Sequence, residues 1–101
     1  ELATYDDARV PVAVARISSA GGFLSNSGFA SVTKVSTGAY DITLSSTIAT
    51  NDQITQITTD YGTLCGGAVP LSTSVIRVTI INVLTNAYQN SNFAITVNDG
   101  P

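Results

Sequence analysis

Strict alternation of apolar and polar side chains makes Phe29–Leu44 the clearest structural signal in the chain. In its second half, Tyr40, Ile42 and Leu44 alternate with smaller or polar residues. A period of two over this length is typical of a β-strand with one buried and one solvated face. The preceding Ser-Thr-Gly sequence ends at Gly38, which supplies the positive φ that tight hairpin turns often require. The segment therefore predicts an antiparallel hairpin with Tyr40 in the core.

Four further segments show the pattern of strands. They are Val10–Ile17, Gln53–Thr59, Ser74–Val83 and Phe93–Val97. Pro11 places the first of them at a sheet edge or at its own first residues, and Ala13 and Ala15 suggest close approach to a neighbour. Arg77 stands on a mostly apolar face, so we expect it to pair with a carboxylate, either Asp41 or Asp60.

Gly, Ser, Asn and Pro gather between these strands and predict loops. The predicted loops are Ser18–Gly28, Asp60–Thr73 and an Asn-rich turn before Phe93 that contains Tyr88. Within the second loop, Ala68–Leu71 is either a brief strand or a crossing segment.

Short strands separated by turn signals indicate an all-β fold, an antiparallel β-sandwich of the jelly-roll kind with six to eight strands. The chain has 101 residues, the size of one domain. We assign residues 10–101 to a single sandwich. Residues 1–9 are the most charged segment and are interpreted as a lead-in from an upstream shaft or domain.

Charged residues make up only 11 % of the chain, against about 25 % in an average soluble domain. The four cations, Arg9, Arg16, Lys34 and Arg77, are widely scattered. No basic patch is available for phosphates, which argues against nucleic acid and anionic membranes as partners. No apolar run approaches the ~20 residues of a membrane span, so membrane insertion is not expected.

Catalytic chemistry has few candidate residues here. The chain has no histidine, which removes the commonest general base and metal ligand. Asp41 with Asp60 or Asp52 could form a glycosidase pair, but solvated or turn-capping aspartates are the favoured interpretation. Cys65 is the single cysteine; a small buried side chain is favoured over a reactive thiol or an interchain disulfide. We therefore expect a protein that is not an enzyme, with no metal and no cofactor.

Recognition remains as a function, and aromatic residues in loops are its candidates. Tyr61 and Tyr88 lie among Asn, Asp and Gly residues, where a rigid amphipathic ring beside amides suits contact with a carbohydrate or a protein. Phe23 is either a third binding residue or an anchor that holds its loop down, and the anchor is favoured. For both tyrosines, packing in a core or an interface is the alternative.

The chain contains Thr-Gly-Ala-Tyr at residues 37–40, Ser-Val-Ile-Arg-Val at residues 74–78 and Ser-Asn-Phe at residues 91–93. In this order the motifs resemble those of the small C-terminal domain found at the tips of bacteriophage tail fibres and tail spikes. In that family a strand, a Thr-Gly-x-Tyr turn and an alternating strand precede a Ser/Thr-Val-Arg-Val strand and a last strand opening with Ser-x-Phe. The order is matched by Gly38, Tyr40, Val75, Arg77, Val78, Phe93 and Val97. The match covers most of Val10–Val97. Aromatic residues of the family's first strand are replaced by Val12, Ala13 and Val14, and the tyrosine expected near Gln53–Thr59 is absent.

The resemblance implies a homotrimer at the tip of a virion fibre or spike, outside the cell. It also implies a receptor-binding role toward a host cell-surface glycan or protein, together with closure of the trimer. A purely structural trimerisation and folding module is one alternative. A pilin or adhesin-type sandwich, which would be a monomer, is another.

Overall fold

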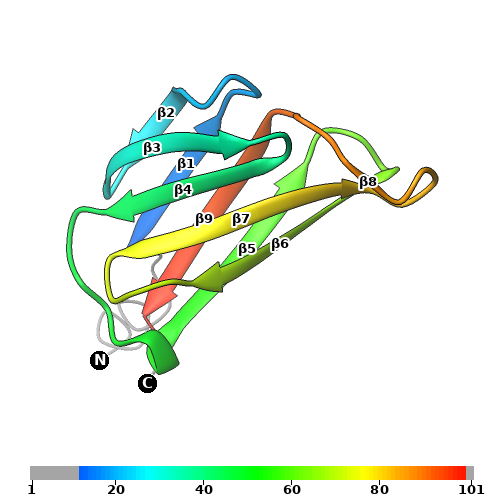
Figure 1. The fold of residues 1–101 in the computed structure, drawn as a ribbon. Helices are drawn as coiled ribbons and strands as arrows, with labels where there is room; N and C mark the ends of the chain where they lie inside the picture. The colour runs from blue at the N-terminus through cyan, green and yellow to red at the C-terminus, as the bar shows by residue number, and fades with distance from the viewer. Residues whose placement is uncertain (1–11, 100–101) are drawn as a thin grey trace, which may run out of the picture.

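The computed structural model describes residues 12–99, which form two antiparallel β-sheets packed against each other (Figure 1). The first sheet has the order β2 (Phe23–Ser27), β1 (Ala13–Ile17), β9 (Phe93–Asp99) and β5 (Gln53–Thr59). The second has the order β3 (Phe29–Ser36), β4 (Ala39–Leu44), β7 (Val75–Asn82) and β6 (Leu64–Pro70). A two-residue strand, β8 (Ala87–Tyr88), also pairs with β7, and a 3-10 turn, η1 (Thr50–Asp52), precedes β5.

The strands of the two sheets cross steeply when seen from the front in Figure 1. At the lower end of this view β1 begins, β9 ends and η1 leads into β5. At the upper end β1 turns into β2, β5 leaves for β6, and the segment after β8 enters β9. The loops 18–22, 60–63 and 89–92 therefore belong to one end of the sandwich.

Alternating side chains of four inner strands build the core. Each strand turns every second residue inward, as its sequence pattern predicts. The strands contribute Ala13, Ala15 and Ile17 from β1, Tyr40, Ile42 and Leu44 from β4, Ile76, Val78 and Ile80 from β7, and Phe93, Ile95 and Val97 from β9. All twelve side chains are at most 4 % exposed. Full burial of a Val, Leu, Ile or Phe side chain contributes roughly 1.5–3 kcal/mol.

Two glycines bring the sheets together at their edges. Gly28, with a φ of +95°, turns the chain from β2 into β3, and a Cβ there would lie 2.8 Å from the Cα of Ala13. The close approach expected for Ala13 is therefore to this corner. On the opposite edge, a Cβ on Gly66 of β6 would collide with the side chain of Ile57 on β5. Both sites need glycine because no side chain fits between the sheets.

The all-β antiparallel sandwich predicted from the sequence is confirmed. Within residues 12–99 the nine strands exceed the predicted six to eight, because β2, β8 and most of β6 lie in segments predicted as loops or turns. The segment Ser18–Gly28 is not wholly loop, since it contains β2. Asp60–Thr73 contains the seven-residue β6 (Leu64–Pro70), whose last residues, 68–70, coincide with the brief strand considered at Ala68–Leu71. Tyr88 belongs to β8 rather than a turn. The lead-in at residues 1–9 lies outside the described residues.

Candidate binding clefts

The loops 18–22, 60–63 and 89–92 enclose an open cleft of about 240 Å³ at the upper end of the sandwich. Its walls are polar except for one aromatic ring. They consist of Ser19, Asp60, Tyr61, Asn90, Ser91 and Asn92. We call this the Tyr61 cleft. Hydroxyls, amides and one tyrosine are groups that orient a polar ligand and stack against it.

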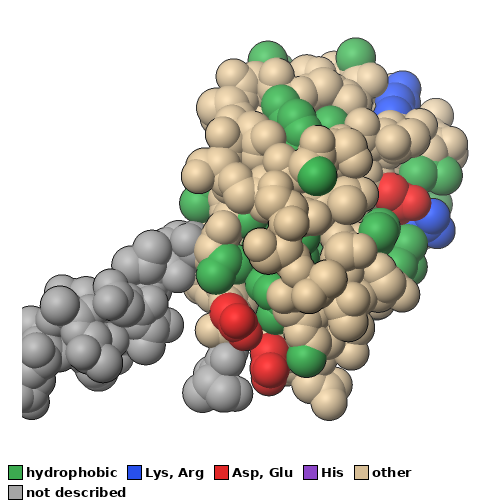
Figure 2. Space-filling model, turned by 90° about the vertical axis from the view of Figure 1, so that its left-hand side faces the viewer, with side chains coloured by type: hydrophobic (Ala, Val, Ile, Leu, Met, Phe, Trp, Pro, Cys, Tyr) green, Lys and Arg blue, Asp and Glu red, His purple; other side chains and the backbone are tan. Residues whose placement is uncertain are grey.

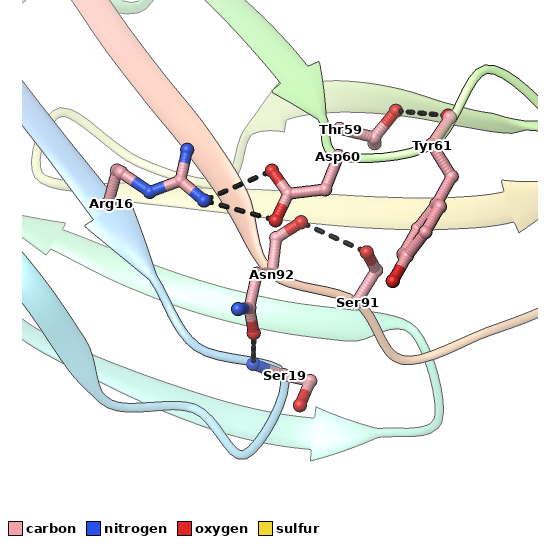
Figure 3. A network of polar contacts seen from close by, with 7 residues as sticks. All are labelled: Arg16, Ser19, Thr59, Asp60, Tyr61, Ser91 and Asn92. Atoms are coloured by element: carbon pink, nitrogen blue, oxygen red, sulfur yellow. Dashed lines mark hydrogen bonds and ion pairs between the residues drawn. The ribbon is translucent and has the colours of Figure 1, made fainter.

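Tyr61 offers its ring to solvent while its backbone is fixed. The residue is 66 % exposed, and Figure 3 shows its ring descending from the loop beside Ser91. The carbonyl oxygen of Tyr61 accepts from the backbone N–H of Leu64 at 3.1 Å and lies 3.1 Å from the Thr59 hydroxyl. A ring held on a fixed backbone loses little conformational entropy when a ligand binds.

The floor of the cleft is joined by hydrogen bonds between loops far apart in sequence. The side-chain oxygen of Asn92 accepts from the backbone N–H of Ser19 at 2.8 Å (Figure 3). From the side of the core, the Tyr40 hydroxyl donates to the carbonyl oxygen of Ser19 at 2.9 Å. Ser91 is only 5 % exposed, and its hydroxyl donates to the carbonyl oxygen of Asn92 at 3.0 Å. These bonds fix the 18–22 and 89–92 loops against each other.

Tyr40 is fully buried and packs its ring against Phe93, with ring centroids 5.1 Å apart. Burial raises the pKa of the Tyr40 hydroxyl above its ordinary value of 10.0, and a backbone hydrogen bond with Ser91 acts in the opposite direction. The hydroxyl therefore stays protonated at neutral pH and can donate to Ser19. The expected role of Tyr40 in packing is confirmed, and the structure adds this contact with the cleft.

An ion pair neutralises the charged group of the cleft. Nη2 of Arg16 lies 3.0 Å from each carboxylate oxygen of Asp60. Both side chains remain partly exposed, at 46 % and 33 %, so the pair adds little stability by itself. Because the charges of Arg16 and Asp60 cancel, the wall of the cleft carries no net charge. The molecular face in Figure 2 is similarly poor in charged groups, with hydrophobic side chains scattered among polar ones.

A second cavity, of about 280 Å³, lies on the outer face of the β3-β4-β7-β6 sheet. It is lined by Ser36, Thr37, Ala39, Arg77, Thr79 and Tyr88, and we call it the Tyr88 groove. Tyr88 is 61 % exposed. Because Asn90 lines the Tyr61 cleft and accepts from the backbone N–H of Gly38 at 2.8 Å, the β3–β4 turn separates the two cavities.

Arg77 pairs with Asp41, the first of its two expected partners. Nε and Nη2 of Arg77 donate to the two carboxylate oxygens of Asp41 at 2.8 and 2.9 Å. The two residues are direct neighbours across β4 and β7. Hydrogen bonding from Arg77 lowers the pKa of Asp41, which keeps the carboxylate ionised across the physiological range.

The three residues singled out from the sequence do not form one site. Tyr61 and Tyr88 line different cavities. Phe23 lines neither; it is half-buried, packs against the core and stacks on Phe29 with ring centroids 6.4 Å apart. We therefore leave Phe23, placed as an anchor, out of the candidate site. Sequence reasoning missed the contributions of Ser19 and Asn92, because only the folded chain brings these loops together.

Cys65 corrects another expectation, because it is exposed rather than buried. Leu64 is the inward residue at the start of β6 and is 6 % exposed, so the next residue turns outward. There Cys65 is paired with Ile81 across the sheet.

The aspartates considered for catalysis are distributed over the molecule. Asp41 lies on the outer face of β4, Asp60 in the Tyr61 cleft and Asp52 in η1. The first two are neither free in solvent nor turn caps, since each pairs with an arginine. Among residues 12–99, no three His, Cys, Asp or Glu side chains gather in a way that could hold a metal ion. The same part of the chain has no helix long and apolar enough to cross a membrane.

Comparison of the chain with protein-family models, with curated proteins and with solved structures finds no match.

Proposed function

We propose that this protein is a non-catalytic recognition domain that binds a cell-surface glycan in the Tyr61 cleft. The observation that carries the proposal is a 66 % exposed tyrosine standing over a floor of serine and asparagine groups. The face of a sugar ring is apolar and its edge carries hydroxyls. An aromatic ring with fixed amides and hydroxyls beside it complements both.

The resemblance to phage tail fibre and tail spike tips supports the biological setting that we propose. There the domain would be the receptor-binding tip of a homotrimeric virion fibre and would contact the host surface through its loops. The loops that line the Tyr61 cleft lie at the end of the sandwich opposite the start of β1 (Figure 1). A shaft entering at β1 would leave the cleft facing outward.

The outer face of the β2-β1-β9-β5 sheet is the surface that we propose for trimer contacts. Val12, Val14 and Ile54 alternate with inward residues and are 46 %, 44 % and 46 % exposed. Obligate interfaces between subunits cover apolar side chains of this kind, and a closed assembly also protects sheet edges. The alternative of a purely structural trimerisation module rests on the same apolar side chains.

A glycan microarray carrying bacterial surface polysaccharides tests the recognition role. We expect the labelled protein to be retained by a subset of glycans and Tyr61→Ala to lose most of that retention. Leu84→Ala is the control, because it removes a highly exposed side chain, 77 % exposed, that lines neither cavity. Retention of no glycan, or equal retention of the wild type and Tyr61→Ala, would contradict the proposal.

Size-exclusion chromatography with light scattering tests the trimer. We expect a trimer for the wild type and dissociation for Val14→Asp. Val69→Asp is the control, because Val69 is also about half exposed, at 52 %, but lies on the other sheet. A monomeric wild type, or a Val14→Asp variant that stays trimeric, would contradict this assignment of the interface.

A further inference from the structure

The strand register explains the shape of the Tyr88 groove. Across the outer face of the second sheet, Ser36 is paired with Ala39, Ala39 with Thr79, and Thr79 with Gly67. All four residues in this row are small. A Cβ added to Gly67 would be 3.9 Å from the nearest atom, the Thr79 hydroxyl oxygen, so the row is open above the backbone. It forms the floor of the groove.

Larger residues stand in the rows on either side of this floor. One row consists of Tyr88, Ile81 and Cys65, which are paired across β8, β7 and β6. The other consists of Asp41, Arg77 and Val69, paired across β4, β7 and β6. The groove thus has an aromatic and apolar wall opposite a wall that carries an ion pair.

The ion-pair wall keeps hydrogen-bonding capacity. Arg77 uses Nε and Nη2 for Asp41, and within residues 12–99 its Nη1 donates no hydrogen bond. The Arg77 side chain is 39 % exposed, so its remaining N–H groups can reach a ligand. The hydroxyls of Ser36, Thr37 and Thr79 each offer a donor and acceptors.

The charge of the groove limits which ligands it suits. Asp41 cancels the charge of Arg77, and no other charged residue lines the groove among those described. An anionic ligand would approach Asp41 without a free cation to pair with it. A neutral ligand with several hydroxyls on one edge and an apolar face on the other meets no such penalty.

We propose that the Tyr88 groove is a second binding site, for a neutral pyranoside whose apolar face stacks on Tyr88 while its hydroxyls bond Arg77, Thr37 and Thr79. The site does not depend on the Tyr61 cleft, because none of its lining residues is shared with that cleft. The recognition role proposed for Tyr61 and this second site can therefore fail separately.

Heteronuclear NMR of the full chain tests the proposal. The probes are the methyl pyranosides of glucose, galactose, mannose and N-acetylglucosamine. Each is titrated to roughly 50 mM, well above the dissociation constant on the order of 1 mM that a ligand of about a dozen non-hydrogen atoms reaches. We expect at least one of them to shift the amide signals of Thr37, Thr79 and Tyr88 in a saturable way.

Four variants assign the shifts to the groove. Tyr88→Ala should weaken binding about tenfold or more, a loss equivalent to about 1.4 kcal/mol. Tyr88→Phe should retain binding, because it keeps the ring face, and Tyr61→Ala should leave the groove shifts unchanged. Dispersed spectra confirm that each variant is folded, and Arg77→Gln gives a second test from the opposite wall. The proposal would be overturned if none of the four probes shifted the groove signals in a saturable way. It would also be overturned if Tyr88→Ala and Arg77→Gln both left the affinity unchanged.

Discussion

At the scale of single residues, Tyr40 connects the core with the Tyr61 cleft. Its ring packs on Phe93 inside the sandwich, and its hydroxyl bonds the carbonyl oxygen of Ser19 in the cleft floor. We expect Tyr40→Phe to lower the free energy of unfolding by about 1 kcal/mol, because the Ser19 carbonyl loses its partner.

That loss corresponds to a melting temperature about 4–8 °C lower for a domain of this size, measurable by thermal denaturation followed by circular dichroism. The variant should also bind glycan more weakly than the wild type, since the 18–22 loop loses its support from below. An unchanged melting temperature would show that the Tyr40 hydroxyl does not hold the loop.

The pH dependence of stability gives a separate test of the same hydroxyl. Burial raises the pKa of folded Tyr40 above 10.0, whereas the unfolded chain releases this proton near the ordinary value. The stability that the Tyr40 hydroxyl contributes is therefore fully present below pH 10.0 and is lost as the pH rises through the pKa of the folded state. In urea unfolding, the wild type should lose its advantage over Tyr40→Phe as the pH rises above 10.0. A constant difference between the two proteins would contradict the raised pKa.

Residue pairs differ in how well the sequence could predict them. Arg77 was expected to pair with Asp41 or Asp60, because a charge on an apolar strand face needs a partner nearby, and Asp41 is the partner. Arg16 and Asp60 are 44 residues apart, and no local pattern brings them together. Cys65 was placed wrongly, because apolar neighbours suggested burial while the alternation of β6 turns it outward.

At the scale of elements, β6 depends on Gly66. Ile57 of β5 packs directly over this glycine, so a methyl group cannot be added without moving one of the two strands. We expect Gly66→Ala to cost about 1–3 kcal/mol of stability, the usual range for overpacking, as measured by urea unfolding. Gly67→Ala is the matched control on the adjacent residue, where the nearest atom to an added Cβ is 3.9 Å away. Equal stability of the two variants would mean that β5 and β6 are not in contact.

Elements with regular alternation were predictable, whereas two of the four edge strands, β2 and β6, were not. The inner strands β4, β7 and β9 have a buried residue at every second position, which their sequences display. In contrast, β2 and β6 lie at sheet edges and expose most of their side chains. Gly66, Gly67 and Pro70 resembled a loop because they are turn residues. A proline is tolerated at the end of an edge strand, and a glycine where another side chain approaches closely.

At the scale of the whole molecule, the two outer faces have different proposed roles. We assign the β2-β1-β9-β5 face to trimer contacts and leave the β3-β4-β7-β6 face to solvent and ligand. Cys65 is a natural probe of the second face because it is exposed there. We expect native Cys65 to react fully with a thiol reagent in the assembled protein.

A cysteine placed on the first face, as Val14→Cys in a Cys65→Ser background, should react at least tenfold more slowly in the assembly than in denaturant. Protection of Cys65 together with a reactive Cys at position 14 would show that the other face is covered instead.

Convergence of loops is the part of the candidate site that sequence patterns cannot supply. The exposure of Tyr61 follows from its polar neighbours in the sequence. The meeting of Ser19, Asn90 and Asn92 around it depends on the order of strands in both sheets, which alternation does not determine. The fold class was thus accessible from local patterns, whereas the cleft required the assembled sandwich.

The most direct measurement of the central claim is NMR mapping of the glycan that the wild-type protein retains most strongly on the array. If the Tyr61 cleft is the recognition site, amide signals of the loops 18–22, 60–63 and 89–92 will shift, and Tyr61→Ala will abolish the shifts in these loops while remaining folded. Shifts confined to the opposite end of the sandwich, around η1 and the end of β9, would contradict the account.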